Sequence, residues 1–148
     1  MGIFDSLDIS ASGLSAERLR MDVTSENLAN AQTTRGANGR PYQRKEVVLQ
    51  QAGGGSFGAA LAGVMGSTSQ TAPGGVEVAG IVQDATQGQL VYDPGHPDAN
   101  AQGYVRMPNV EPVEEMTDLI TESRTYEANV TAMSTAKSMY TKSLDILR

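Results

Sequence analysis

The sequence contains no cysteine, a single histidine and only seven aromatic residues among 148. Without cysteine, neither a disulfide framework nor a thiolate metal site can form. Only 39 % of the residues are apolar, so we do not expect a large globular core. The net charge of −6 argues against nucleic acid as a partner, because nucleic acid requires clustered Lys and Arg.

Long apolar runs are also absent. No segment approaches the roughly 20 apolar residues that cross a bilayer, so the chain is not expected to span a membrane. The first residues, Met1-Gly-Ile-Phe-Asp-Ser, lack a basic leader followed by an apolar stretch. We therefore expect no cleaved signal peptide.

The sequence does contain a seven-residue apolar repeat near each end. In the C-terminal part, one row comprises Leu119, Tyr126, Met133, Tyr140 and Leu147, and a second row comprises Met116, Ser123, Val130, Lys137 and Leu144. Near the N-terminus, the repeating residues are Leu7, Leu14, Met21 and Leu28. A repeat of 3.5 residues is typical of helices that supercoil around a partner. The sequence therefore predicts a mainly α protein whose long terminal helices pair as a coiled coil.

The segment between the two repeats is expected to be small and irregular. We assign residues 1–32 to the N-terminal helix, 33–112 to loops and short β-strands, and 113–148 to the C-terminal helix. Strands are predicted around Val47–Leu49, Val76–Val82 and Leu90–Tyr92. A glycine-rich insert at 52–75 has too few apolar side chains to offset the entropy of ordering it, so we expect a mobile loop there.

Each predicted helix carries a second apolar stripe. Ile9, Ala16, Leu19 and Val23 form it on the N-terminal helix, and Ala128, Ala132, Met139 and Ile146 form it on the C-terminal helix. A helical hairpin in water needs only one apolar face per helix. The chain's own middle segment could cover the second face, but that segment is thinly apolar. A packed array of identical or related subunits accounts better for two faces.

The local motifs do not favour catalysis. Two carboxylates flank the only histidine in Asp93-Pro-Gly-His-Pro-Asp98, but a metal site needs three or more ligands held in fixed geometry. A calcium loop starting at Asp98 fails at Asn109, where a bidentate Glu belongs. We predict no catalytic, cofactor-binding or metal-binding residues, with a metal-dependent enzyme kept as a remote alternative.

A small basic cluster follows the first helix, comprising Arg35, Arg40, Arg44 and Lys45. The simplest interpretation is a solvated loop. The alternative is a contact with an acidic neighbour, such as the 111–118 edge of an adjoining subunit.

Three segments resemble the flagellar rod and hook proteins. They are Ser25-Glu-Asn-Leu-Ala-Asn30 with Thr33 and Thr34, Tyr126-Glu-Ala-Asn-Val130, and Asp93 through Val110. The third segment is most similar to a short rod component of that family. The resemblance marks Asn27, Leu28, Asn30, Tyr126 and Asn129 as family-box residues.

This resemblance implies a structural subunit of the proximal rod in the bacterial flagellar basal body, the periplasmic drive shaft between motor and hook. It also implies other copies of the chain, other rod proteins and the flagellar type III export apparatus as partners, without a cofactor. Asn27 and Asn30 are expected to tie the helix end to the following loop through side-chain hydrogen bonds. The alternative is another flagellar axial component, such as a different rod or hook-type protein.

Overall fold

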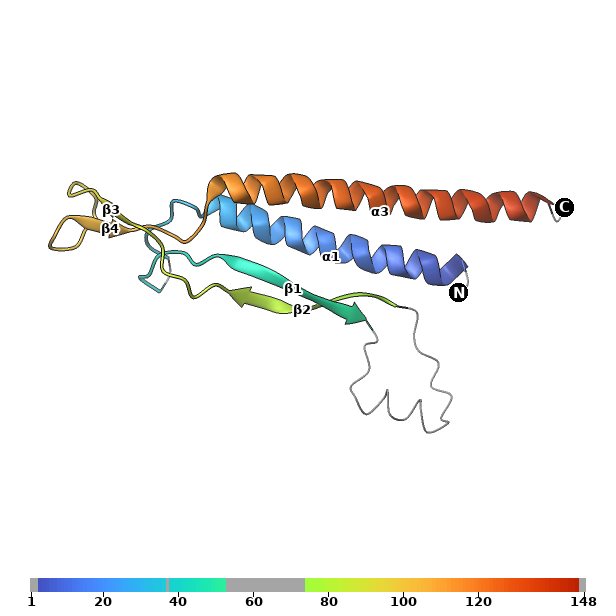
Figure 1. Ribbon diagram of the computed structural model, residues 1–148, viewed down its shortest axis with the longest axis horizontal. Coiled ribbons are helices and arrows are strands. Elements are labelled where there is room, and N and C mark those ends of the chain that lie inside the picture. Colours follow the sequence, from blue (N-terminus) through green and yellow to red (C-terminus); the bar gives the residue numbers. More distant parts are fainter. Residues whose placement is uncertain (1–2, 37, 53–73, 147–148) are drawn as a thin grey trace, which may run out of the picture. The chain divides into compact units, whose positions relative to one another are not determined.

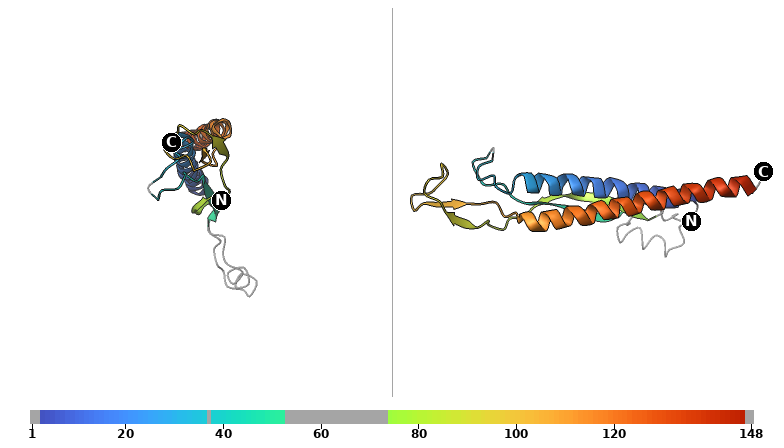
Figure 2. Two further views of the ribbon diagram at one scale, coloured as in Figure 1. Left: turned by 90° about the vertical axis from the view of Figure 1, so that its left-hand side faces the viewer. Right: turned by 90° about the horizontal axis from the view of Figure 1, so that it is seen from above.

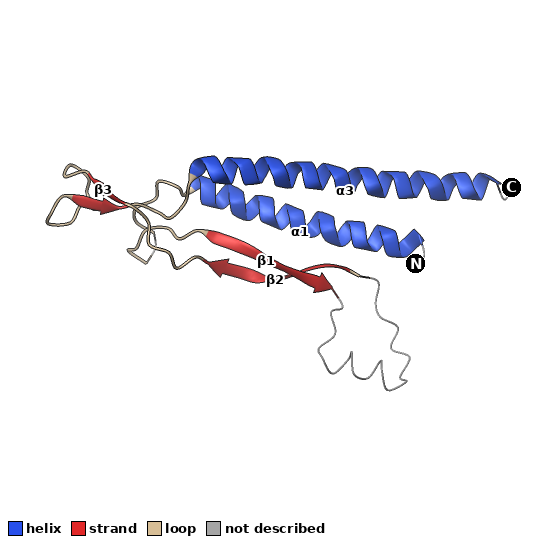
Figure 3. Cartoon of the chain, viewed as in Figure 1, coloured by secondary structure: helices blue, strands red, loops and turns tan. Residues whose placement is uncertain are grey.

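The computed structural model describes residues 3–36, 38–52 and 74–146. Two helices dominate this part of the chain: α1 (Ile3–Ala29) has 27 residues and α3 (Pro112–Ile146) has 35 (Figures 1 and 3). Between them lie four strands in two small sheets. The prediction of two terminal helices around a small strand region is therefore confirmed. Leu147 and most of the insert 52–75 lie outside the described residues.

Local chemistry accounts for the start of α3 and the end of α1. α3 starts at Pro112, a first helical position where the missing backbone N–H costs nothing. Glu114 and Glu115 follow in its first turn, where the helix dipole favours negative charge. α1 ends just before Asn30, whose side-chain Nδ2 donates to the Glu26 carbonyl oxygen at 2.9 Å.

The first sheet pairs β1 (Lys45–Ala52) with β2 (Gly75–Gln83), whose arrows run in opposite directions in Figure 1. The first part of β1 alternates: Lys45, Val47 and Leu49 are half-buried, whereas the residues between them are exposed. This alternation is the two-residue period of a strand with one covered face.

The second sheet is an antiparallel hairpin of β3 (Leu90–Tyr92) and β4 (Tyr104–Arg106), with Val91 paired to Val105. The sequence predicted β1, β2 and β3 but missed β4. β4 has only three residues, which is too short a pattern to recognise in the sequence. Gly103 has a φ of +80°, a conformation that glycine adopts without steric cost.

The chain divides into two compact units. Unit 1 comprises Met1–Arg18, Leu49–Ala79 and Arg124–Arg148. Within it, a Cβ built on Gly13 would lie only 3.1 Å from Asn129 Nδ2, so the absence of a side chain lets α1 approach α3 closely. The backbone N–H of Val76 donates to Ser12 Oγ at 3.1 Å and joins β2 to α1.

Unit 2 comprises Leu19–Val48 and Gly80–Ser123. In both views of Figure 2, the last turns of α1 run beside the first turns of α3. The buried apolar residues of this unit are Val23, Val105 and Val110. Its buried polar residues are Thr24, Asn27, Glu115 and Glu122. The interior of unit 2 is thus as much polar as apolar. Neither helix in the described part of the chain has the length and apolar content that crossing a membrane requires.

Candidate functional site

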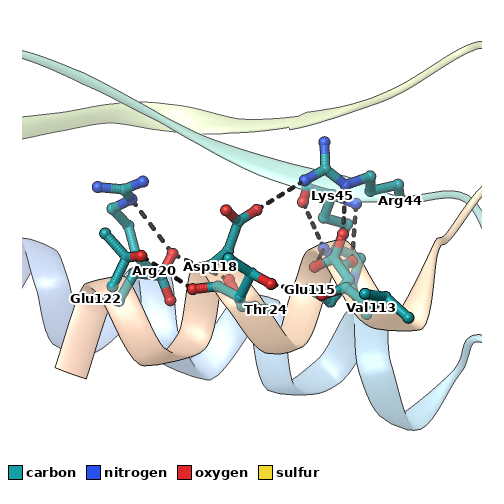
Figure 4. A network of polar contacts seen from close by, with 11 residues as sticks. Arg20, Thr24, Arg44, Lys45, Val113, Glu115, Asp118 and Glu122 are labelled. Atoms are coloured by element: carbon teal, nitrogen blue, oxygen red, sulfur yellow. Dashed lines mark hydrogen bonds and ion pairs between the residues drawn. The ribbon is translucent and has the colours of Figure 1, made fainter.

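Polar side chains of α1, of α3 and of the segment 42–45 that leads into β1 make hydrogen bonds and ion pairs in unit 2, several of which are drawn in Figure 4. At one end, Asn27 is only 1 % exposed. Its Oδ1 accepts hydrogen bonds from the Tyr42 hydroxyl at 2.8 Å and the Lys45 backbone N–H at 2.9 Å. Its Nδ2 donates to the Lys45 carbonyl at 2.9 Å and to Glu115 Oε2 at 3.1 Å. All four bonds available to an amide side chain are made.

Glu115 carries the second part of the network. It is also 1 % exposed, and Arg44 Nε donates to its Oε1 at 2.5 Å. Arg44 Nη2 reaches Asp118 Oδ2 at 3.4 Å. A buried carboxylate is tolerated when it is paired and hydrogen-bonded. The bond to Glu115 is the main reason that the pKa of the Arg44 guanidinium is raised above its usual value.

A further polar contact lies one heptad along α3. Thr24 Oγ1 donates to Glu122 Oε1 at 3.1 Å, and Arg20 Nε lies 3.6 Å from the same oxygen. Glu122 is 4 % exposed. Because Glu115 and Glu122 are seven residues apart, they face the same direction. The row that α3 turns towards α1 in unit 2 is therefore polar.

The two apolar rows predicted on α3 differ in how far they are covered. Leu119, Tyr126 and Met133 are half-buried, whereas Tyr140 is exposed. The second predicted row is exposed throughout its described length; its members are Met116, Ser123, Val130, Lys137 and Leu144. It lies one residue after the buried row that contains Glu115 and Glu122. This rotation of α3 lets Glu115 and Glu122 accept hydrogen bonds from Asn27, Arg44 and Thr24, which apolar side chains in their place could not do.

On α1, the predicted row is half-buried along its whole length; it comprises Leu7, Leu14, Met21 and Leu28. The second stripe is covered more fully, with Ala16 and Val23 buried. On α3, the opposite stripe is exposed at Ala128, Ala132 and Met139. Apolar side chains of α3 therefore reach the surface on more than one side.

The other box asparagines also have defined places. Asn30 Oδ1 accepts a hydrogen bond from Thr33 Oγ1 at 3.1 Å, and Asn129 lies against Gly13 in unit 1. The bond between Thr33 and Asn30 and the bonds of Asn27 with Lys45 and Tyr42 tie the end of α1 to the segment that follows it. Such ties were expected. The sequence analysis missed the partners of Asn27, although the heptad spacing of Glu115 and Glu122 was a usable signal.

The basic cluster is engaged largely by acidic groups of the same unit. Arg44 pairs with Glu115 and Asp118, and Arg35 Nη1 lies 3.5 Å from Asp98 Oδ1. Lys45 Nζ lies 2.6 Å from Glu26 Oε1. Within its own chain, Arg44 binds the 111–118 edge through Glu115 and Asp118, whereas a contact of the cluster with that edge of another subunit stays a prediction.

The segment around the histidine is a hydrogen-bonded turn. Asp93 Oδ1 accepts from the Gly95 backbone N–H at 3.1 Å, and His96 Nδ1 accepts from the Asp98 N–H at 3.1 Å. Within the described ranges, no group of three or more His, Cys, Asp or Glu could hold a metal ion. The geometry of this segment is that of a surface turn.

Comparison with known proteins decides the family. Residues 7–37 match a family model described as Flagella basal body rod protein, and residues 101–146 match one described as Flagellar basal body rod FlgEFG protein C-terminal. A flagellar basal-body rod protein FlgC of Bacillus subtilis is 53 % identical over 150 residues, which cover 99 % of each chain. The chain belongs to the FlgC family of flagellar basal-body rod proteins.

Other FlgC proteins are similar to this chain at lower identity. The protein of that name from Escherichia coli O157:H7 is 39 % identical over 99 % of this chain and 98 % of its own length. That from Aquifex aeolicus is 37 % identical over 98 % of this chain and 97 % of its own. The resemblance inferred from the three sequence segments is thereby confirmed.

Proposed function

We propose that this chain is a structural subunit of the proximal rod of the bacterial flagellar basal body, the periplasmic shaft that transmits torque from motor to hook. Membership of the FlgC family supports this proposal. The observation that carries it in the structure is the distribution of apolar side chains. Among the described residues, fifteen large apolar side chains are exposed, whereas only four apolar residues are buried. Exposed apolar surface on this scale marks protein interaction sites.

The subunit would act through packing rather than chemistry. On α3, exposed residues such as Met116, Val130 and Leu144 would insert between helices of neighbouring subunits in a coiled-coil-like manner. The FlgC family is one of structural rod proteins, which accords with this role. Each contact is weak, but a rod repeats it in every subunit, so the array resists twisting.

The partners follow from the same proposal. They are other copies of this chain and other rod proteins, with the flagellar type III export apparatus delivering the unprocessed chain to the periplasmic rod. The apolar rows would face those neighbours, and the family-box residues would hold each subunit in a shape that can pack.

Replacing Val130 tests the proposal. Val130 is 43 % exposed, so Val130→Asp should leave the free chain folded but place a carboxylate in the apolar contact, at a cost of several kcal/mol. In a strain that lacks its own copy, we expect normal synthesis, no chain in purified basal bodies by immunoblot, and no swimming. Val130→Leu is the matched control and should restore both. Swimming with Val130→Asp would contradict the proposal.

A second variant, Ala128→Asp, tests the opposite stripe of α3, where Ala128 is exposed. If that face also meets a neighbour, the variant should be excluded from basal bodies as well. Normal swimming would limit the contact to one face of the helix.

A further inference from the structure

The apolar repeats of this chain leave the pairing register of α1 and α3 undetermined. Leu7, Leu14, Met21 and Leu28 recur every seven residues, as does the row that begins at Leu119. Sliding one helix by a heptad moves it by about 10.5 Å and sets nearly the same apolar residues opposite one another. A repeat of this kind makes the two helices pair but does not fix how far one is displaced along the other.

The polar contacts in unit 2 do not recur every seven residues along α1. Only Asn27, among the residues of α1, is hydrogen-bonded in the structure to Lys45, Tyr42 and Glu115 at once. A one-heptad slide in one direction would put Glu115 beside Thr24 and Arg20, where Glu122 now lies, and would leave Asn27 and Arg44 without a carboxylate. A slide in the other direction would put Glu122 beside Asn27 but Asn129, which has no charge, beside Thr24 and Arg20. Only the observed register supplies a carboxylate to both sites, and separating a buried carboxylate from its partners is strongly destabilising. The wrong register is thus penalised by the buried charge.

We propose that Asn27 and Glu115 are positioning residues that select one register of the α1–α3 pair in unit 2. Buried polar contacts add little net stability compared with apolar residues of the same size, but they can exclude alternative registers. The Thr24–Glu122 contact, one heptad further along α3, acts in the same sense. This property belongs to the single chain and does not depend on the rod assignment.

The absence of cysteine makes the register measurable by spin labelling. Ser25 and Ser123 are exposed residues of the two helices in unit 2. In the Ser25→Cys/Ser123→Cys chain with two nitroxide labels, double electron–electron resonance should give one distance population. Adding Asn27→Leu and Glu115→Leu replaces the polar contact with an apolar one. We expect a second population of label-to-label distances, which corresponds to a slide of one helix by about 10 Å along the other.

The matched control adds two leucines and removes one carboxylate at outward positions of the same helices. Ala29→Leu/Glu114→Leu meets these conditions, since both residues are exposed, and it should keep the single distance. A purely stabilising role for Asn27 and Glu115 would lower the free energy of unfolding without adding a distance population.

A second variant covers the case in which the paired leucines abolish the far-ultraviolet helix signal. Asn27→Asp keeps the size of the side chain and the acceptor oxygen for Tyr42 and Lys45, but it opposes two carboxylates where Glu115 now accepts a hydrogen bond. Repulsion should again populate another register. A single native distance in Asn27→Asp, or in a helical Asn27→Leu/Glu115→Leu chain, would overturn the proposal. So would two populations in the labelled chain without these substitutions.

Discussion

Tyr42 shows how burial and nearby charges set the protonation state of a residue beside the network. Its hydroxyl donates to Asn27 Oδ1 at 2.8 Å, and its aromatic ring lies under the Lys45 ammonium, 5.8 Å from Nζ to the ring centroid. Burial, followed by the nearby carboxylates of Glu26 and Glu115, raises the pKa of Tyr42 to about 12. The folded chain therefore holds this phenol in its neutral, donating form.

The raised pKa predicts a loss of stability in alkali. Because the folded-state pKa lies above the usual value of 10.0, the stabilisation from Tyr42 is complete below pH 10 and is lost as the pH rises towards 12. Tyr42→Phe should lower the free energy of unfolding by about 1 kcal/mol at pH 8 and should flatten its decline between pH 10 and 12. Urea denaturation followed by circular dichroism measures both effects. Equal declines in the two proteins would contradict the prediction.

Gly88, beside the β3–β4 hairpin, lies where the neighbouring backbone leaves no room for a side chain. A Cβ on Gly88 would lie 1.9 Å from the Met107 carbonyl oxygen and 2.7 Å from the Pro108 carbonyl carbon. Both are backbone atoms, so a rotamer change cannot relieve the clash. The chain passes here because residue 88 has no side chain, and the adjacent bond from the Met107 N–H to the Gln89 carbonyl at 2.9 Å depends on this approach.

Gly88→Ala should accordingly separate these two segments. We expect the free energy of unfolding to fall by roughly 2 kcal/mol. The amide NMR shifts of Leu90–Tyr92 and Tyr104–Arg106 should change strongly. Gly80→Ala makes the same substitution where no atom lies within 4 Å of the added Cβ, and it should leave the hairpin shifts in place. Unchanged hairpin shifts in Gly88→Ala would refute this account.

The helices were predictable because their signals are local. Heptad spacing, Pro112 and the acidic first turn of α3 all lie within the elements that they define. The polar row was not predictable from the same count, since counting apolar residues selects Met116 rather than Glu115. The burial of Glu115 is explained only by its partners Arg44 and Asn27, which lie 71 and 88 residues away in the sequence. Long-range hydrogen bonds decided which side of α3 faces α1 in unit 2.

At the scale of the whole molecule, the described residues bury at least as many polar as apolar side chains, while many large apolar side chains are exposed. Val113, Ile120 and Met139 are each more than half exposed, whereas Glu115 and Glu122 are buried. Such a distribution is unfavourable for an isolated subunit and favourable for one that is covered by neighbours. Stability in the free chain should therefore be concentrated where the chain supplies its own partners.

Hydrogen exchange on the free chain tests this distribution. Residues 115–123 of α3 include Glu115 and Glu122, both buried and hydrogen-bonded to side chains of unit 2. By contrast, every side chain from Lys137 to Asp145 is exposed, and a helical end without packing is marginal in water. Amides of 115–123 should exchange at least tenfold more slowly than those of 137–145.

Assembly should reverse the difference, because neighbouring subunits would cover the exposed turns. Mass spectrometry after deuterium labelling of purified basal bodies should find residues 137–145 as protected as 115–123. Equal protection of the two segments in the free chain would mean that α3 is stable throughout without neighbours. Fast exchange of 137–145 in basal bodies would mean instead that this end of the helix takes no part in packing.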